Sequence, residues 1–124
     1  MLKLFWVMSG GCIGAACRYG INLLAAQLWG SRFPWGTLAV NLAGCFLIGL
    51  IFSLAERVPW LTPSIRLFLV TGFLGAFTTF SSFAVETVNT VNATSGYIAA
   101  ANFLANNMGG LILTLTGMWL ARFL

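Results

Sequence analysis

Charged side chains are almost absent from four stretches of this chain, and each stretch is long enough to cross a lipid bilayer. Of the 124 residues, 60 % are apolar and only 6 % are charged, whereas charged residues make up about a quarter of a soluble domain. Since about 20 apolar residues in a helix span the hydrocarbon core, the pattern predicts an all-α integral membrane protein. The four predicted transmembrane helices cover residues 4–28, 35–54, 67–91 and 98–121.

The connectors between these stretches are short, so residues 1–124 are predicted to form a single four-helix transmembrane domain. On such a path, four cations share one side of the membrane: Lys3, Arg57, Arg66 and Arg122. Because cytoplasmic loops are enriched in Lys and Arg, this distribution favours both termini in the cytoplasm. The cations are scattered singly at helix ends, so the net charge of +4 does not indicate a nucleic-acid partner.

The side chains of common catalytic sites are scarce. The sequence has no histidine, and its only carboxylates are Glu56 and Glu86, which are far apart. A Ser-His-Asp triad, a carboxylate pair or a His/Cys metal site cannot be assembled from these residues. The chain is therefore not expected to be an enzyme, which leaves transport, conduction or a structural role.

Polar or small residues recur every fourth position in two of the predicted helices, so they share one face of each helix. In the second helix they are Thr37, Asn41, Cys45 and Gly49, and in the fourth Asn102, Asn106, Gly110 and Thr114. Such faces often serve helix packing, because small residues allow close approach and amides bond across the contact. Packing rarely needs the three asparagines of the fourth helix, however, so a polar path is the alternative interpretation.

The third predicted helix combines aromatic and hydroxyl side chains. Phe73, Phe77, Phe80 and Phe83 follow helical spacing, and between them lie Thr78, Thr79, Ser81 and Ser82. The phenylalanines can form a packing ridge, or their positively polarised ring edges can solvate a small anion together with amide and hydroxyl hydrogens. Because a fixed cation would hold such an ion too tightly, the absence of Lys and Arg here favours conduction over binding.

The same helix is predicted to be broken in mid-membrane. Gly72 and Gly75 weaken it, and Thr78 and Thr79 compete for backbone hydrogen bonds. A break at this depth is tolerated inside protein or beside a cavity, and it would free carbonyl groups that can hold a small cation.

Two charged residues lie within or at the end of predicted helices. Arg18 is the one cation deep in a span, and it should face protein, a vestibule or the membrane interface. Glu86 lies near the end of the third helix, either at the mouth of a pathway or as a hydrogen-bonded structural acid.

Three ordered motifs resemble the small fluoride channels of the Fluc family, also called CrcB. They are a glycine-rich segment at residues 10–19, a Gly-Thr-Leu-x-x-Asn segment at 36–41 and a Thr-Thr-Phe-Ser-Ser-Phe segment at 78–83. The resemblance extends over nearly the whole chain. It implies an antiparallel, dual-topology homodimer in the cell inner membrane, with two pores at the subunit interface through which fluoride leaves the cell passively.

The resemblance also implies roles for individual residues. The fluoride pathway would comprise Asn41, Phe80, Phe83, Ser81, Ser82, Asn106 and Thr114. The backbone carbonyls of Gly75 and Thr78 would hold a structural sodium ion (Na+) at the centre of the dimer. Arg18 and Glu86 would act electrostatically near an aqueous vestibule. Ser82 stands where the family usually has threonine, and Gly110 where many relatives carry a serine.

Two other classes of membrane protein are considered. A small proton-coupled multidrug exporter needs a carboxylate in its first helix, and residues 4–28 contain none. A non-transporting scaffold subunit would explain the faces of small residues, but not the clustered hydroxyls and phenylalanines. Replacement of Phe80 by an aliphatic residue distinguishes a packing ridge from a ring-edge site for an anion. A packing ridge should tolerate the replacement, whereas a ring-edge site should not.

Overall fold

The computed structural model describes residues 2–93 and 95–124, and within these ranges it contains helices and no strand. In chain order the helices are α1 (Leu2–Trp29), α2 (Trp35–Leu54), α3 (Pro63–Arg66), η1 (Leu67–Leu74), α4 (Gly75–Phe77), α5 (Phe80–Ala93), α6 (Gly96–Leu104), η2 (Ala105–Gly109), α7 (Gly110–Leu120) and η3 (Ala121–Phe123). The stretches η1 and η2 are π-helical, and η3 is a 3₁₀ turn.

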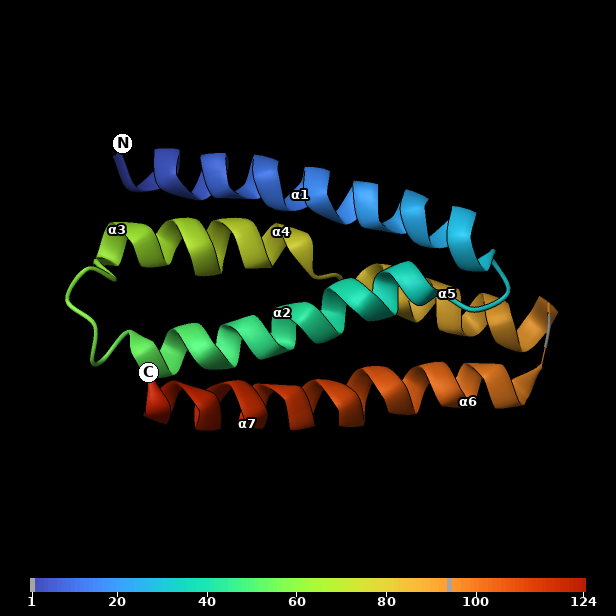
Figure 1. Cartoon of the computed structure of the whole chain (residues 1–124). Coiled ribbons are helices and arrows are strands. Elements are labelled where there is room, and N and C mark those ends of the chain that lie inside the picture. The colour runs from blue at the N-terminus through green and yellow to red at the C-terminus, as the bar shows by residue number, and fades with distance from the viewer. Residues whose placement is uncertain (1, 94) are drawn as a thin grey trace.

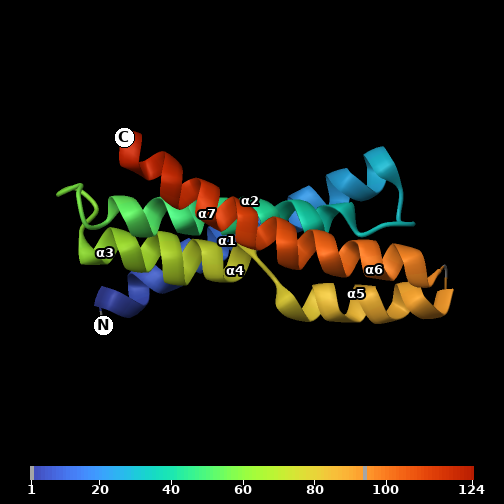
Figure 2. The same cartoon turned by 90° about the horizontal axis from the view of Figure 1, so that it is seen from below.

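These elements join into long rods that lie side by side (Figure 1). The helices α3, η1 and α4 run into one another without a gap, as do α6, η2, α7 and η3. The start of α1, the end of η3 and the connection from α2 to α3 lie at one end of the bundle, and the α1–α2 loop lies at the other, together with the end of α5 and the start of α6. Figure 2 shows α5 beyond the end of α4, joined to it by a short extended segment.

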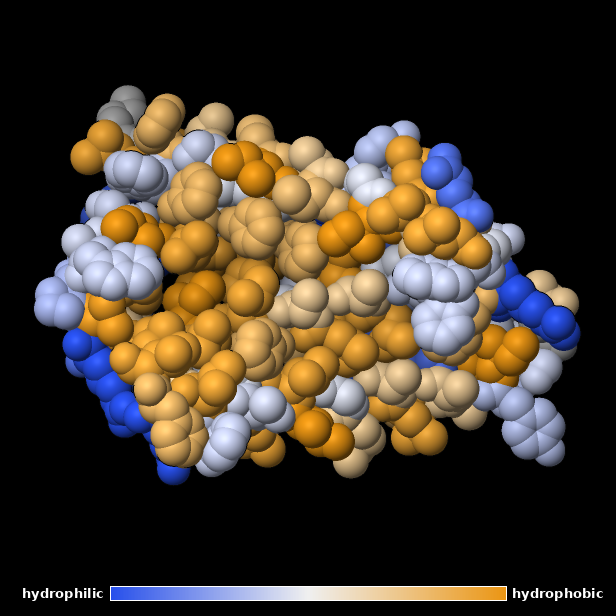
Figure 3. Space-filling view, viewed as in Figure 1, coloured by the Kyte–Doolittle hydropathy of each residue, from blue (hydrophilic) through white to orange (hydrophobic). Residues whose placement is uncertain are grey.

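Three helical stretches are long and apolar enough to cross a membrane: Trp35–Leu54, Pro63–Ala93 and Gly96–Phe123. The helix α1 has 28 residues, but its glycines and Arg18 make it less apolar than these three. On the face seen in Figure 3, apolar side chains cover the middle of the molecule and hydrophilic ones gather toward its two ends. This distribution matches a lipid-facing surface, and the chain is a multi-pass membrane protein.

Glycines set the closest contacts between the rods. A Cβ atom on Gly14 of α1 would collide with the backbone of Phe73 in η1, and one on Gly49 of α2 would collide with the backbone of Thr114 in α7. Small residues permit such backbone contact between membrane helices, which gains van der Waals energy where no hydrophobic effect drives association. The buried apolar cluster consists of Val40, Leu74 and Phe77.

Gly14→Ala is expected to lower the free energy of unfolding by about 1–3 kcal/mol, the usual cost of overpacking, because the methyl group must push α1 away from η1. Gly20→Ala is the matched control on the same helix, since nothing lies within 4 Å of a Cβ atom built there. Thermal unfolding of both variants in detergent measures the difference. Equal melting temperatures would contradict the close α1–η1 contact.

The third rod is interrupted at Thr78 and Thr79, inside the predicted span 67–91. Thr78 adopts an extended backbone conformation (φ −85°, ψ 157°), and its hydroxyl donates to the Leu74 carbonyl at 3.0 Å. Thr79 Oγ1 accepts a hydrogen bond from the Ser82 amide at 3.2 Å, as an N-cap side chain does at the start of a helix. One threonine therefore bonds back to the end of α4 while the next caps α5.

Candidate functional site

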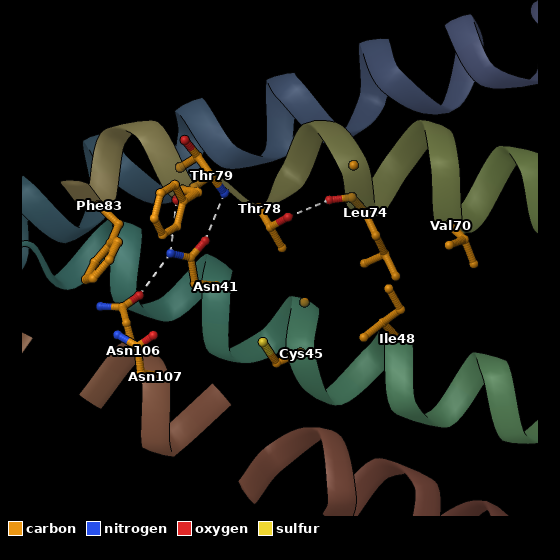
Figure 4. Close-up of a pocket in the computed structure, with 13 residues that line it drawn as sticks. Asn41, Cys45, Ile48, Val70, Leu74, Thr78, Thr79, Phe83, Asn106 and Asn107 are labelled. Atoms are coloured by element: carbon orange, nitrogen blue, oxygen red, sulfur yellow. Dashed lines mark hydrogen bonds between the residues drawn. The ribbon is translucent and has the colours of Figure 1, made fainter. Parts of the chain in front are cut away.

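An open cavity of about 330 Å³ lies beside this break. Figure 4 shows that its walls come from α2, from both sides of the break and from η2. The lining residues are Asn41, Gly44, Cys45, Ile48, Val70, Leu74, Gly75, Thr78, Thr79, Phe80, Phe83, Asn106 and Asn107. The wall thus combines amides and hydroxyls with apolar side chains, and none of these residues is charged.

Asn41 is the centre of the hydrogen-bond network at the break. The Thr79 amide donates to Asn41 Oδ1 at 2.9 Å, and Asn41 Nδ2 donates to the Thr79 carbonyl at 3.2 Å. Asn41 Nδ2 also donates to Asn106 Oδ1 at 2.9 Å. An interrupted helix leaves backbone groups that need partners, and one side chain from α2 satisfies both groups of Thr79. Asn41 therefore ties the break to α2 and to the C-terminal rod.

The network continues from Asn106 toward α5. Asn106 Nδ2 donates to the Asn102 carbonyl at 3.0 Å and to Asn102 Oδ1 at 2.9 Å. Asn102 is fully buried, and its Nδ2 donates to Thr87 Oγ1 at 2.8 Å. The Thr87 hydroxyl in turn donates to the Phe83 carbonyl at 2.7 Å. The buried polar groups of this region are thus connected across three rods rather than left without partners.

Phe80 and Phe83 line the cavity with opposite exposure. Phe83 is 6 % exposed and packs near Phe103, with the ring centroids 6.2 Å apart. Phe80 is 78 % exposed, and its ring centroid lies 5.6 Å from that of Phe83. The structure thereby brings both predicted phenylalanines to the same cavity as Asn41 and Asn106.

The predicted hydroxyls are divided between two places. Ser81 and Ser82 lie at the start of α5, with their oxygens 3.4 and 3.1 Å from Thr79 Oγ1. Thr114 lies on α7, outside the residues that line the cavity, and its hydroxyl donates to the carbonyls of Cys45 (3.1 Å) and Gly110 (3.0 Å). Thr114 therefore contributes to the α2–α7 contact within the chain.

The backbone carbonyls of Gly75 and Thr78 lack the amide partners that a continuous helix would give them. The Thr79 amide donates to Asn41, and the Ser82 amide donates to the Thr79 side chain. These are the amides four residues after Gly75 and Thr78, where α-helical bonds would form. Within residues 2–93 and 95–124, no hydrogen bond reaches either carbonyl oxygen, and no cluster of His, Cys, Asp or Glu resembles a metal site. The donor set is one of neutral oxygens, which suits a hard monovalent cation.

A second cavity, of about 370 Å³, lies toward the end of the bundle that carries the α1–α2 loop. Glu86 lines it, and the Thr37 hydroxyl donates to Glu86 Oε1 at 2.8 Å. Arg32 lines the same cavity. Arg18 is half-buried on α1 and lines neither of these two cavities. Of the two charged residues predicted for a vestibule, the structure places Glu86 at this second cavity and Arg18 outside it.

Comparison with known proteins places the chain in a family. The family model described as "CrcB-like protein, Camphor Resistance (CrcB)" matches residues 5–118. The chain belongs to the CrcB family. The resemblance drawn from the three sequence motifs is confirmed by this match.

Relatives of this CrcB-family chain align over nearly its whole length. A protein of Salinibacter ruber named "Fluoride-specific ion channel FluC" is 43 % identical over 126 residues, which cover 100 % of this chain and 92 % of the relative. Proteins with the same name from Nitrosococcus oceani and Chloroflexus aurantiacus are 39 % and 40 % identical, over 98 % and 99 % of this chain and 98 % of each relative.

Four residues that bond around the two cavities were not among the pathway residues predicted from sequence: Thr37, Thr79, Thr87 and Asn102. Thr37 and Asn102 lie on the polar faces of their helices, so their spacing did carry a signal. The capping role of Thr79 is a local signal as well, because threonine is one of the residues preferred at a helix N-cap. Thr87 had no such signal, since its partner Asn102 is on another rod.

Proposed function

We propose that this CrcB-family chain forms a channel through which fluoride crosses the cell inner membrane passively. The observation that carries the proposal is the cavity at the break, where Asn41, Asn106, Phe80 and Phe83 meet without a charged residue. The shared name of the relatives, a fluoride-specific ion channel, agrees with this chemistry. It also agrees with a chain that lacks the residues of an enzyme active site.

The chemistry of the wall suits a small, strongly hydrated anion. Amide and hydroxyl hydrogens replace the hydration shell of fluoride, and the positive edges of Phe80 and Phe83 add weak attraction. Conduction needs sites that bind weakly enough to release the ion. A wall of neutral donors meets that need, whereas a lysine or arginine in the cavity would retain the anion.

The two cavities lie in succession along the same helices. On α2, Thr37 lines the second cavity and Asn41 the first, one helical turn apart. On α5, Glu86 lines the second cavity and Phe83 the first. The second cavity serves as the vestibule, where Arg32 attracts the anion before it reaches Asn41.

The proposed assembly is an antiparallel homodimer of protomers that each cross the membrane four times, with α1 as the first span. One bundle of four packed helices leaves little room for an aqueous path. The cavity is open on the outside of the protomer, and Phe80 stands 78 % exposed at its wall. A second copy closes the open side and lines the pore together with the first.

A sodium ion is proposed between the two breaks, held by the Gly75 and Thr78 carbonyls of both protomers. The free state of these carbonyls in the protomer supports the proposal. When bound, the ion supplies a fixed positive charge that stabilises the dimer. Removing Na+ by dialysis against a large organic cation is therefore expected to lower the dimer fraction and the fluoride flux together. Size-exclusion chromatography and flux assays, repeated with K+, measure both; full dimer and full flux without either cation would contradict the site.

The experiment that tests the function is ion efflux from liposomes containing the purified protein, followed with fluoride and chloride electrodes. Rapid fluoride loss with negligible chloride loss is expected. A folded dimer that releases no fluoride would contradict channel function and favour a scaffold subunit.

A further inference from the structure

The two amides of the proposed fluoride pathway, those of Asn41 and Asn106, donate all of their hydrogens within the protein. A carboxamide nitrogen carries two hydrogens. Those of Asn41 go to the Thr79 carbonyl and to Asn106 Oδ1. Those of Asn106 go to the carbonyl and the Oδ1 of Asn102. A fluoride ion can gain an N–H from either side chain only by displacing one of these acceptors.

Two backbone groups determine which way the amides point. The Thr79 N–H can only donate, so Asn41 must turn its oxygen toward Thr79 and its nitrogen toward Asn106. Asn106 must therefore turn its Oδ1 toward Asn41 to accept that hydrogen bond. The Asn102 carbonyl can only accept, and it independently requires the Asn106 nitrogen on its own side. The orientation of the whole chain of amides therefore follows from the backbone and is not a free choice between amide flips.

Asn102 accepts both hydrogens of the Asn106 amide. Asn106 lines the cavity, whereas Asn102 is 0 % exposed and is not part of the lining. Asn102 is itself fixed by its bond to Thr87 Oγ1 on α5. The terminal torsion of an asparagine is broad, so the Asn106 amide can turn toward an ion in the cavity once Asn102 Oδ1 releases it.

We propose that Asn102 is a positioning residue that competes with fluoride for the Asn106 N–H and so keeps fluoride binding weak. It acts through Asn106 and does not touch the ion. Each fluoride that gains this donor breaks one protein hydrogen bond, so the exchange is nearly balanced and the ion can leave. The inference rests on the proposed function, because it concerns how tightly that same site holds fluoride.

Two substitutions of Asn102 are expected to shift fluoride affinity in opposite directions. Asn102→Leu removes the competing acceptor at similar size, and the fluoride concentration giving half-maximal flux should fall about three- to tenfold, the worth of one hydrogen bond. Asn102→Asp keeps the acceptor and adds a negative charge, and the same concentration should rise about tenfold or more. The matched controls are Asn92→Leu and Asn92→Asp on an exposed position of α5, which should leave it unchanged.

A merely structural role predicts a different pattern. If both Asn102 variants lower the maximal flux without moving the half-maximal concentration, or move it in the same direction, the proposal is overturned. Wild-type protein that conducts fluoride normally in the same assay shows that only this inference has failed. Wild-type protein that conducts none shows that the proposed function has failed and the inference with it.

A measurement on the unaltered full chain keeps the proposal testable if a variant does not fold. Side-chain amide signals of ¹⁵N-labelled protein are recorded by NMR in detergent during a sodium fluoride titration, with sodium chloride as the control salt. The Asn106 and Asn102 signals should shift with fluoride and not with chloride, while Asn92 stays unchanged. Unshifted Asn106 and Asn102 signals at fluoride concentrations that saturate flux would overturn the proposal.

Discussion

Asn41→Asp is expected to reduce fluoride flux more than about a hundredfold, because a negative charge about 4 Å from an anion costs roughly 4 kcal/mol at the dielectric of a protein surface. Asn41 lines the cavity at the break and bonds both Thr79 and Asn106. The aspartate also loses the Nδ2 donor and sets an oxygen against Asn106 Oδ1. Fluoride-electrode recordings of liposome efflux measure the effect.

The matched control for this charge is Asn92→Asp, at an exposed position of α5 outside the residues that line the two cavities. Its flux should equal that of the wild-type protein. Size-exclusion chromatography reports whether each variant is a folded dimer. Wild-type flux from a folded Asn41→Asp dimer would remove Asn41 from the ion pathway.

Phe80→Ile and Phe83→Ile are each expected to lower fluoride flux about tenfold or more while the proposed dimer stays folded. Isoleucine keeps an apolar side chain but has no positively polarised ring edge to place near an anion. A tenfold loss corresponds to about 1.4 kcal/mol of lost attraction. Phe80 is the cleaner test for folding, because it is 78 % exposed and its truncation leaves little cavity in the protomer. Efflux assays on both variants, with dimer content measured in parallel, check the result.

Phe5→Ile provides the control for these two substitutions. Phe5 is 61 % exposed on α1, near the N-terminus and away from the break. Its flux should match the wild-type value. If Phe80→Ile and Phe83→Ile also conduct normally, the phenylalanines form a packing ridge and their ring edges play no part in conduction.

Helix content and helix positions could be predicted well from this sequence, because each long apolar stretch of a membrane protein corresponds to a helix. The helix α2 occupies the predicted residues 35–54, and the described break at Thr78 and Thr79 falls among the hydroxyls that suggested it. The π-helical stretches η1 and η2 could not be predicted from the sequence, because π-helix formation depends on how a helix packs against its neighbours and not on its own residue types.

The candidate site was predictable in its residue types and less so in its connections. Helical spacing put Asn41 and Asn106 on polar faces, and the structure joins them by a hydrogen bond. The pairings of Asn102 with Thr87 and of Thr37 with Glu86 link positions far apart in the chain, which spacing within one helix cannot reveal. The place of Thr114 in the α2–α7 contact likewise depends on which side of α7 meets α2.

The central claim, that fluoride passes selectively through this protein, is tested most directly by current recordings from a planar bilayer with fluoride on one side and an equal concentration of chloride on the other. The account predicts that the current reverses at a potential far from zero, because fluoride carries the current and chloride carries no detectable part of it. A current that reverses at zero, as expected for a pore that passes both anions alike or only the shared cation, would contradict a fluoride-selective pore.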